Sequence, residues 1–243
     1  MTLIDTLPDD VLLEIFNFHQ KYYGLYFYGL KRRENWWHTL VHVCRRWRCI
    51  VFGSPRHLNL QLVCTERTRA RDMLDVWPPF PLIVSYNHYG IESMDNVIAA
   101  LECNDRVYRI HFDNVRGPQL DILLGAMQQP FPELTYLDLP STNKFDETMA
   151  VVPDSFLGGS APRLEYLNLV GIPFPGLPKL LVSTTHLVTL FLDNIPHSGY
   201  ISPDGMVAVL STLTNLEYFL LVFISPRSCP DQASRRPPRS HIF

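Results

Sequence analysis

The histidines and acidic residues of this chain offer few patterns from which a catalytic or metal site could be built. His38 and His42 have the four-residue spacing with which two histidines on one helix bind zinc, but Thr39 stands where a zinc peptidase carries its glutamate. We interpret them as two partly buried structural histidines. The chain has no phosphate-binding glycine motif and no G-x-S-x-G elbow, and its acidic residues are scattered. We therefore expect no enzyme activity, no cofactor and no metal.

The segment "LVHVCRRWRCIVF", residues 40–52, is the second candidate for chemistry, because it combines arginines with large apolar side chains. It could be plain core, a helix that binds nucleic acid, or a helix that meets another protein. A helix that reads DNA needs a hydrated polar face, and here the flanks of the arginines are apolar. A basic patch would also be expected to recur on the same face. The pattern therefore disfavours nucleic acid and favours a protein contact.

Composition and charge limit the class of protein. Of the 243 residues, 47% are apolar and 19% charged, with a net charge of −3, so a sizeable core is expected without a general attraction for nucleic acid or membrane. The five cysteines lack C-x-x-C spacing, which disfavours disulfides and zinc ribbons. The first ten residues do not resemble a signal peptide, and the longest strongly apolar run has seven residues, against roughly twenty for a membrane span. We expect a cytoplasmic or nuclear protein, or one in both compartments.

Two helices are predicted in the first 55 residues, which we interpret as a helical module. In the first, Thr6 is a candidate cap and apolar residues follow at helical spacing. The second spans about residues 36–52 and is too apolar for burial on one side alone. Between them, residues 19–35 form an aromatic insert, interpreted either as a loop packed on its neighbours or as extra contact area for a partner.

Residues 56–224 repeat the pattern L-x-x-L-x-L, and this repeat predicts the fold. Its first apolar positions are separated by 27, 30, 23 and 29 residues, close to the period of leucine-rich repeats. The predicted strands are residues 56–64, 80–86, 105–115, 132–142, 162–172, 185–195 and 214–224. The predicted helices between strands are residues 67–77, 93–103, 119–127, 177–183 and 204–213. The fold class is therefore α/β, with the helical module followed by a curved, leucine-rich-repeat-like solenoid with a parallel sheet.

Strand alternation separates the leucines that point into this array from the residues between them, which point outward along the concave face. The outward set is Arg109, His111, Tyr136, Asp138, Tyr166, Asn168, Thr189, Phe191, Tyr218 and Leu220. Three tyrosines and a phenylalanine on one face suit a protein interface. Stacked rings also stabilise neighbouring strands, so a purely structural ladder is an equal alternative.

The last predicted strand, residues 218–224, is the most apolar one, and residues 225–243 after it are rich in proline and arginine. We expect this tail to be disordered and the strand edge to be open. Two readings remain: the chain is a truncated form of a longer array, or a partner strand covers the edge. In either case the isolated protein is predicted to self-associate.

Two separated segments resemble the F-box motif: "LPDDVLLEIF" at residues 7–16 and "LVHVCRRWRCIVF" at residues 40–52. With the repeats, the chain resembles F-box/leucine-rich-repeat proteins of the fungal type over most of its length. In that family the F-box binds the Skp-type adaptor of a cullin–RING ubiquitin ligase, and the repeats bind the protein to be ubiquitinated.

The resemblance implies a substrate-recognition subunit that does no chemistry itself. The adaptor-binding residues it implies are Leu7, Pro8, Val11, Leu12, Ile15, Phe16, Leu40, Val43, Cys44 and Trp47. The outward set of the repeats, from Arg109 to Tyr218, would bind the target protein, whose identity the sequence does not name. Two alternatives remain: a repeat scaffold that binds the adaptor without assembling a ligase, and a nucleic-acid-associated repeat protein.

Overall fold

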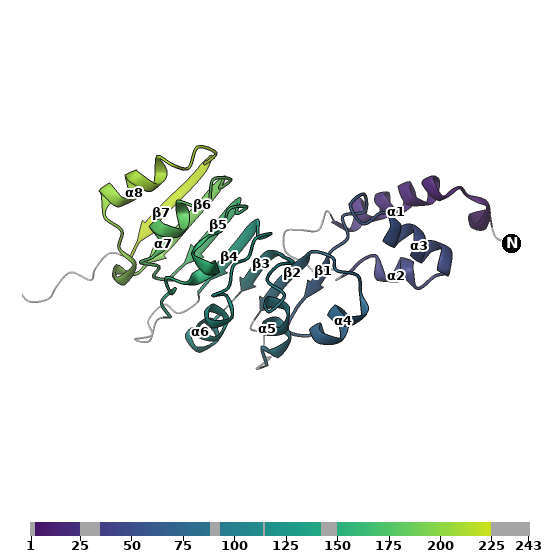
Figure 1. The fold of residues 1–243 in the computed structure, drawn as a ribbon, viewed down its shortest axis with the longest axis horizontal. Helices are drawn as coiled ribbons and strands as arrows, with labels where there is room; N and C mark the ends of the chain where they lie inside the picture. The colour runs from purple at the N-terminus through teal and green to yellow at the C-terminus, as the bar shows by residue number, and fades with distance from the viewer. Residues whose placement is uncertain (1–2, 25–34, 88–92, 114, 142–149, 225–243) are drawn as a thin grey trace, which may run out of the picture.

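The computed structural model is an elongated α/β molecule with one sheet and a helical module at one end (Figure 1). It describes residues 3–24, 35–87, 93–113, 115–141 and 150–224. The predicted tail, residues 225–243, and most of the aromatic insert lie outside the described residues. The structure has no helix that is both long enough and apolar enough to cross a membrane, within the part of the chain that it describes.

The helical module contains three α-helices where the sequence predicted two. They are α1 (Asp9–Gly24), α2 (His38–Val41) and α3 (Arg45–Gly53), preceded by the 3₁₀ helix η1 (Leu3–Thr6). The prediction of one helix over residues 36–52 is wrong. Cys44 is extended, with φ −157° and ψ 170°, and its sulfur accepts a hydrogen bond from the Trp47 N–H at 3.5 Å. Cys44 thus caps a new helix and stops the previous one. Helix α1 also runs further than predicted, into the insert.

Seven strands form the sheet, each overlapping a predicted segment, although only the last three residues of the predicted strand 56–64 are extended. They are β1 (Leu62–Cys64), β2 (Leu82–Asn87), β3 (Val107–Asp113), β4 (Tyr136–Pro140), β5 (Tyr166–Val170), β6 (Thr189–Ile195) and β7 (Tyr218–Phe223). The connecting α-helices are α4 (Ala70–Val76), α5 (Asp95–Leu101), α6 (Gly117–Ala126), α7 (Leu177–Leu181) and α8 (Pro203–Leu210). The 3₁₀ helices η2 (Phe156–Gly159) and η3 (His197–Gly199) complete the described elements.

The strands follow one another across the sheet in chain order, and every neighbouring pair is parallel. Each strand therefore pairs only with the strands before and after it in the sequence. Between two parallel strands, the chain must return to the end of the sheet where the strands begin. Helices such as α5, α6 and α8 lie in those connections. The prediction of an α/β fold with a parallel sheet of about seven strands is confirmed.

Rows of leucines crossing the strands form the core between the sheet and the helices. Two rows occupy matching register positions: Ile110, Leu137, Leu167, Leu190 and Phe219, and then Leu139, Leu169, Leu192 and Leu221. The leucines of β4–β6 in these rows are at most 1% exposed. They belong to the same core as helix residues such as Leu123, Leu180 and Met206. The alternation read from the sequence thus identified the side of each strand that faces the core.

The helical module closes the first edge of the sheet. Trp37 is fully buried, and its indole N–H donates to the carbonyl of Gln61 just before β1 at 3.0 Å. The side-chain oxygen of Asn35 accepts a hydrogen bond from the Val63 N–H at 3.0 Å. Trp77 and Phe80 pack edge-on against the Trp37 ring, with centroids 5.1 and 5.5 Å away. Strand β1 is therefore not an open edge.

The leucine rows generate a stability prediction. Leu167→Ala empties a fully buried position between two occupied neighbours in the row, so we expect a loss of about 2–5 kcal/mol in the free energy of unfolding. Ile122→Ala on the exposed side of α6 removes a similar side chain and should change that free energy by less than about 0.5 kcal/mol. Urea denaturation of both variants measures the difference. Equal losses would contradict the assignment of Leu167 to the core.

Candidate functional site

The outer surface of the helical module carries an apolar stripe. Val11, Ile15 and Phe18 of α1 are exposed, at positions i, i+4 and i+7 on one side of the helix. Pro8 is exposed just before the helix, and Val43 and Cys44 are exposed between α2 and α3. Of these residues, Phe18 is the most exposed at 72%, and the sequence reading missed it although its spacing from Val11 and Ile15 marks the same stripe.

Three of the residues predicted to bind an adaptor lie inside the module instead. Leu12 and Phe16 are 1% exposed and Leu40 is 8% exposed, so their side chains pack in the core and are not available to a partner. Leu7 and Trp47 are half-buried, and Trp47 packs on Phe16 with ring centroids 4.8 Å apart. This corrects the predicted surface: an apolar position in a helical motif is as readily a core position as a contact position.

The arginines of α3 hold the module together. Arg46 donates through Nε to an Asp9 carboxylate oxygen at 2.8 Å, and through its terminal nitrogen to the same oxygen and to the carbonyl of Leu7. Arg48 donates through Nε to the carbonyl of Val41 at 3.0 Å. Two of the three arginines in the basic segment therefore bind groups of the module itself. This arrangement favours a structural and rim role over phosphate binding.

His38 and His42 pack against Trp77. The His38 ring stacks on Trp77 at 4.9 Å with 27° between the planes, and His42 lies edge-on to it at 6.1 Å. Burial, followed by the nearby His42, lowers the pKa of His38 below its ordinary value. Across the residues the structure describes, no group of three or more His, Cys, Asp or Glu side chains could hold a metal ion.

The outward set predicted on the strands forms two rows on the side of the sheet opposite the leucine rows, here called the open face. The first row, in register order, is Arg109, Tyr136, Tyr166, Thr189 and Tyr218. The second row is His111, Asp138, Asn168, Phe191 and Leu220. The structure therefore brings together all ten residues, which come from five strands.

A polar network joins the second row at β3–β5. The His111 Nδ1 lies 2.9 Å from an Asp138 carboxylate oxygen, and its Nε2 lies 3.0 Å from Asp113. Asn168 donates to the other Asp138 oxygen at 2.8 Å, and the Tyr136 hydroxyl donates to Asp138 at 3.4 Å. Asp138 is the centre of this network and is buried, against the expectation that it points into solvent. Its charge is compensated by donors from three strands.

Charge and burial tune the ionisable groups of this network. The hydrogen bonds to Asp113 and Asp138 raise the pKa of His111 to about 9, although burial opposes the shift. His111 is therefore an imidazolium at neutral pH and donates through both nitrogens. Burial, then the Asp138 carboxylate, raises the pKa of Tyr136 above its ordinary value, so its hydroxyl stays protonated. The one imidazolium of this network therefore lies between two carboxylates, those of Asp113 and Asp138.

Aromatic rings stack within the first row and reach Phe191 of the second row. Tyr136 and Tyr166 stack with centroids 4.3 Å apart and 6° between the planes, and the Phe191 ring lies edge-on to Tyr166 at 6.1 Å. The Arg109 guanidinium sits 4.2 Å from the centre of the Tyr136 ring. These side chains are half-buried by one another instead of fully outward. The structural ladder is therefore real, and it leaves only part of each ring for a partner.

Exposure along the open face increases toward β7. Tyr218 is 59% and Leu220 43% exposed, whereas their row neighbours Thr189 and Phe191 are half-buried. The β3–β5 part is polar with its charges paired, and the β6–β7 part is aromatic and aliphatic. The exposed apolar part of this surface, at β6–β7, is of the kind that can bind another polypeptide through apolar contacts. The predicted contact residues thus differ greatly in the surface area that a partner could reach, from the buried Asp138 to the 59% exposed Tyr218.

No family model, curated protein or solved structure matches this chain.

The His111 network generates a pH prediction. Its pKa is about 9 in the folded protein and about 6.5 in the unfolded chain, so protonation favours folding. The stabilisation is fully present below about pH 6.5 and is lost as the pH rises through about 9. We expect the free-energy difference between the wild type and His111→Asn, measured by urea denaturation, to shrink from pH 6 to pH 10. An NMR titration of the His111 imidazole with a midpoint near 6.5 would contradict the network.

Proposed function

We propose that the chain is a substrate-recognition subunit of a Skp–cullin–F-box ubiquitin ligase. In this proposal the helical module is an F-box that binds a Skp-type adaptor. The sheet with its helices is a leucine-rich-repeat array whose open face binds the target protein. The chain acts by proximity, because it holds the target near a ubiquitin-loaded enzyme and needs no catalytic residue of its own.

The observation that carries the proposal is the apolar stripe of the helical module. The two segments that resemble the F-box fold against each other through Phe16 and Trp47, and Arg46 ties the first to the second. This packing leaves Val11, Ile15 and Val43 exposed, although other apolar residues of the module are buried in the core that continues into the sheet. Exposed apolar side chains rimmed by polar groups favour a protein partner.

The position of the helical module supports the binding of two partners at opposite ends of the molecule. Helices α1–α3 lie at one end of the elongated molecule, and strands β5–β7 lie at the other (Figure 1). The exposed part of the open face, around Tyr218 and Leu220, is therefore far from the apolar stripe. Two partners can be bound at once without competing for the same surface.

The two alternatives differ in their support. A scaffold that binds the adaptor without assembling a ligase uses the same surfaces, so only the presence of a cullin distinguishes it. A nucleic-acid-associated protein would use the basic segment, but Arg46 and Arg48 bind Asp9 and the carbonyls of Leu7 and Val41. We therefore do not propose nucleic-acid binding.

A binding experiment with a purified Skp-type adaptor tests the proposal. The double variant Val11→Glu/Ile15→Glu places two charges on exposed positions of α1, so it should fold and bind the adaptor at least tenfold more weakly than the wild type. Val182→Glu is the control, because Val182 is at least as exposed as Val11 and Ile15 but follows α7 near the far end of the molecule. Isothermal titration calorimetry measures both variants against the wild type.

Three outcomes have distinct meanings. A wild-type chain that does not bind the adaptor, or a double variant that binds it unchanged, would refute the F-box assignment. Adaptor binding without co-purification of a cullin would favour the scaffold. Binding to random DNA that falls steeply as salt is raised would restore the nucleic-acid alternative.

A further inference from the structure

Strand β7 lies at the edge of the sheet and is apolar on both faces. It is the last strand in the sheet order, and residues 218–224 include no charged side chain. The exposed fractions on the open face are 59% for Tyr218, 43% for Leu220 and 39% for Val222. On the helix face, Phe219 is 42% exposed. Protein sheets normally protect an edge strand with charges, proline or a covering segment, and within the described residues β7 has none of these.

The backbone of β7 shows which groups point away from the sheet. The N–H group of Tyr218 donates to the carbonyl of Val188, just before β6, and that of Ile224 donates to the carbonyl of Ile195 at the end of β6, both at 3.0 Å. Because successive residues of a strand turn their N–H and C=O groups to opposite sides, those of Phe219, Leu221 and Phe223 point off the free edge. A strand added there must supply donors and acceptors at three alternate positions. It must also be apolar on both faces.

We infer that the free edge of β7 pairs with β7 of a second copy of this chain, antiparallel about a two-fold axis at Leu221. Strand β7 itself meets both requirements, since it is apolar on both faces and its free backbone groups are spaced at every second residue. Its lack of charge means that self-pairing brings no like charges together. A two-fold pairing also closes on itself and stops at two copies.

The position of the axis follows from two constraints. Residues opposite each other must lie on the same face of the sheet, and the outward N–H and C=O groups must meet each other. An axis at Leu221 satisfies both constraints for Phe219, Leu221 and Phe223. With an axis at Leu220, Phe223 would lie opposite residue 217 of the second copy, which precedes the first residue of β7. The resulting pairs are Leu221 with Leu221, Phe219 with Phe223, Leu220 with Val222, and Tyr218 with Ile224.

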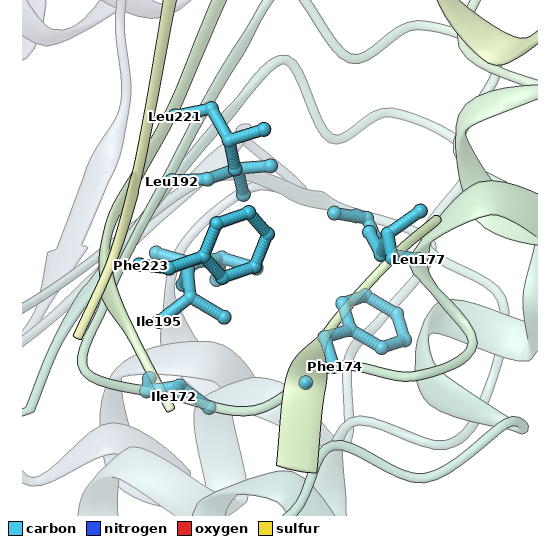
Figure 2. A pocket seen from close by; sticks show the side chains of 10 residues that line it. Ile172, Phe174, Leu177, Leu192, Ile195, Leu221 and Phe223 are labelled. Atoms are coloured by element: carbon cyan, nitrogen blue, oxygen red, sulfur yellow. The ribbon is translucent and has the colours of Figure 1, made fainter. Parts of the chain in front are cut away.

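An apolar cavity behind β7 supports closure at this edge. Figure 2 shows Leu192, Leu221 and Phe223 on one side of the cavity, with Phe174 and Leu177 facing them. The cavity volume is only about 10 Å³, and its lining residues are all apolar or glycine, so it offers no anchoring group for a polar ligand. Leu221 and Phe223 remain only half-buried. The Phe219–Phe223 pairs would cover this side of the strand in both copies.

The expected dimer is weak. The exposed parts of the β7 side chains amount to roughly 400 Å² per copy, about half of the area that a standard stable interface buries on each partner. We therefore expect a dissociation constant in the micromolar range. Dimerisation would join two sheets into one and place the two helical modules at opposite ends, so it does not depend on the proposed adaptor binding and does not block it.

Sedimentation velocity and a cysteine cross-link together test this inference in the full chain. We expect the wild type to shift from monomer to dimer between roughly 1 and 100 µM. Leu220→Lys should weaken the dimer at least tenfold, because it places a charge opposite an apolar side chain at the edge. Its circular dichroism and its adaptor binding should match those of the wild type.

The cross-link measures the register of the β7–β7 pairing, and it remains informative even if Leu220→Lys does not fold. In a background with Cys44, Cys49 and Cys229 replaced by serine, Leu221→Cys should form a disulfide dimer with oxidised glutathione as the electron acceptor, because opposite residues are about 5.5 Å apart. Leu220→Cys is the control, since its two copies lie diagonally, about 7–8 Å apart, and should cross-link far less.

Two results would overturn the inference. A monomer at every concentration, with no Leu221→Cys dimer, would mean that the edge is covered within one chain or stays open. A dimer that is insensitive to Leu220→Lys, or that cross-links equally through both cysteines, would place the contact elsewhere or in another register. Neither result bears on the F-box proposal, which the adaptor titration tests separately.

Discussion

The structure depends on one constraint: no strand of this sheet can bury its leucines alone. Each strand is short and meets only its neighbours in the chain, so Leu167 is buried because Leu137 and Leu190 stand beside it and helices lie over the row. An array of this kind gains stability at each internal junction and is weakest at its two ends. The surfaces that we propose to bind partners lie at those ends and on the face that the helices leave uncovered.

The two ends are treated differently. At the first end, Trp37 and Asn35 satisfy backbone groups next to and within β1, and the helical module packs on the same cluster through Trp77. These contacts cover the edge at β1 and attach the helical module to the sheet. At the last end, β7 keeps its apolar faces and its outward backbone groups. Unpaired backbone groups at a strand edge are therefore bonded within the chain at β1, whereas at β7 we propose that a second copy of the chain bonds them.

Many polar and aromatic side chains of the open face contact one another, which leaves a restricted area for contact with a partner. Around Asp138, His111 and Asn168 supply hydrogen bonds from the two neighbouring strands, so this region holds β3–β5 in their arrangement. A buried network of this kind is sensitive to the removal of any one member, because the remaining charges lose their compensation. If the open face binds a target as we propose, the contact energy should come from the aromatic and aliphatic side chains near β7, where apolar surface is still exposed.

The sequence by itself determined the strands, their order and the side of each that faces the core, because these follow from local alternation and from a repeat that recurs every 23–30 residues. It could not determine that Cys44 would end one helix and cap the next, or that Leu12 and Leu40 would be core instead of contact residues. Nor could it show that Arg46 would bind Asp9, 37 residues away, or that Asp138 would be buried between His111 and Asn168. Those outcomes depend on partners brought together only by packing, whereas alternation acts on neighbours along the chain.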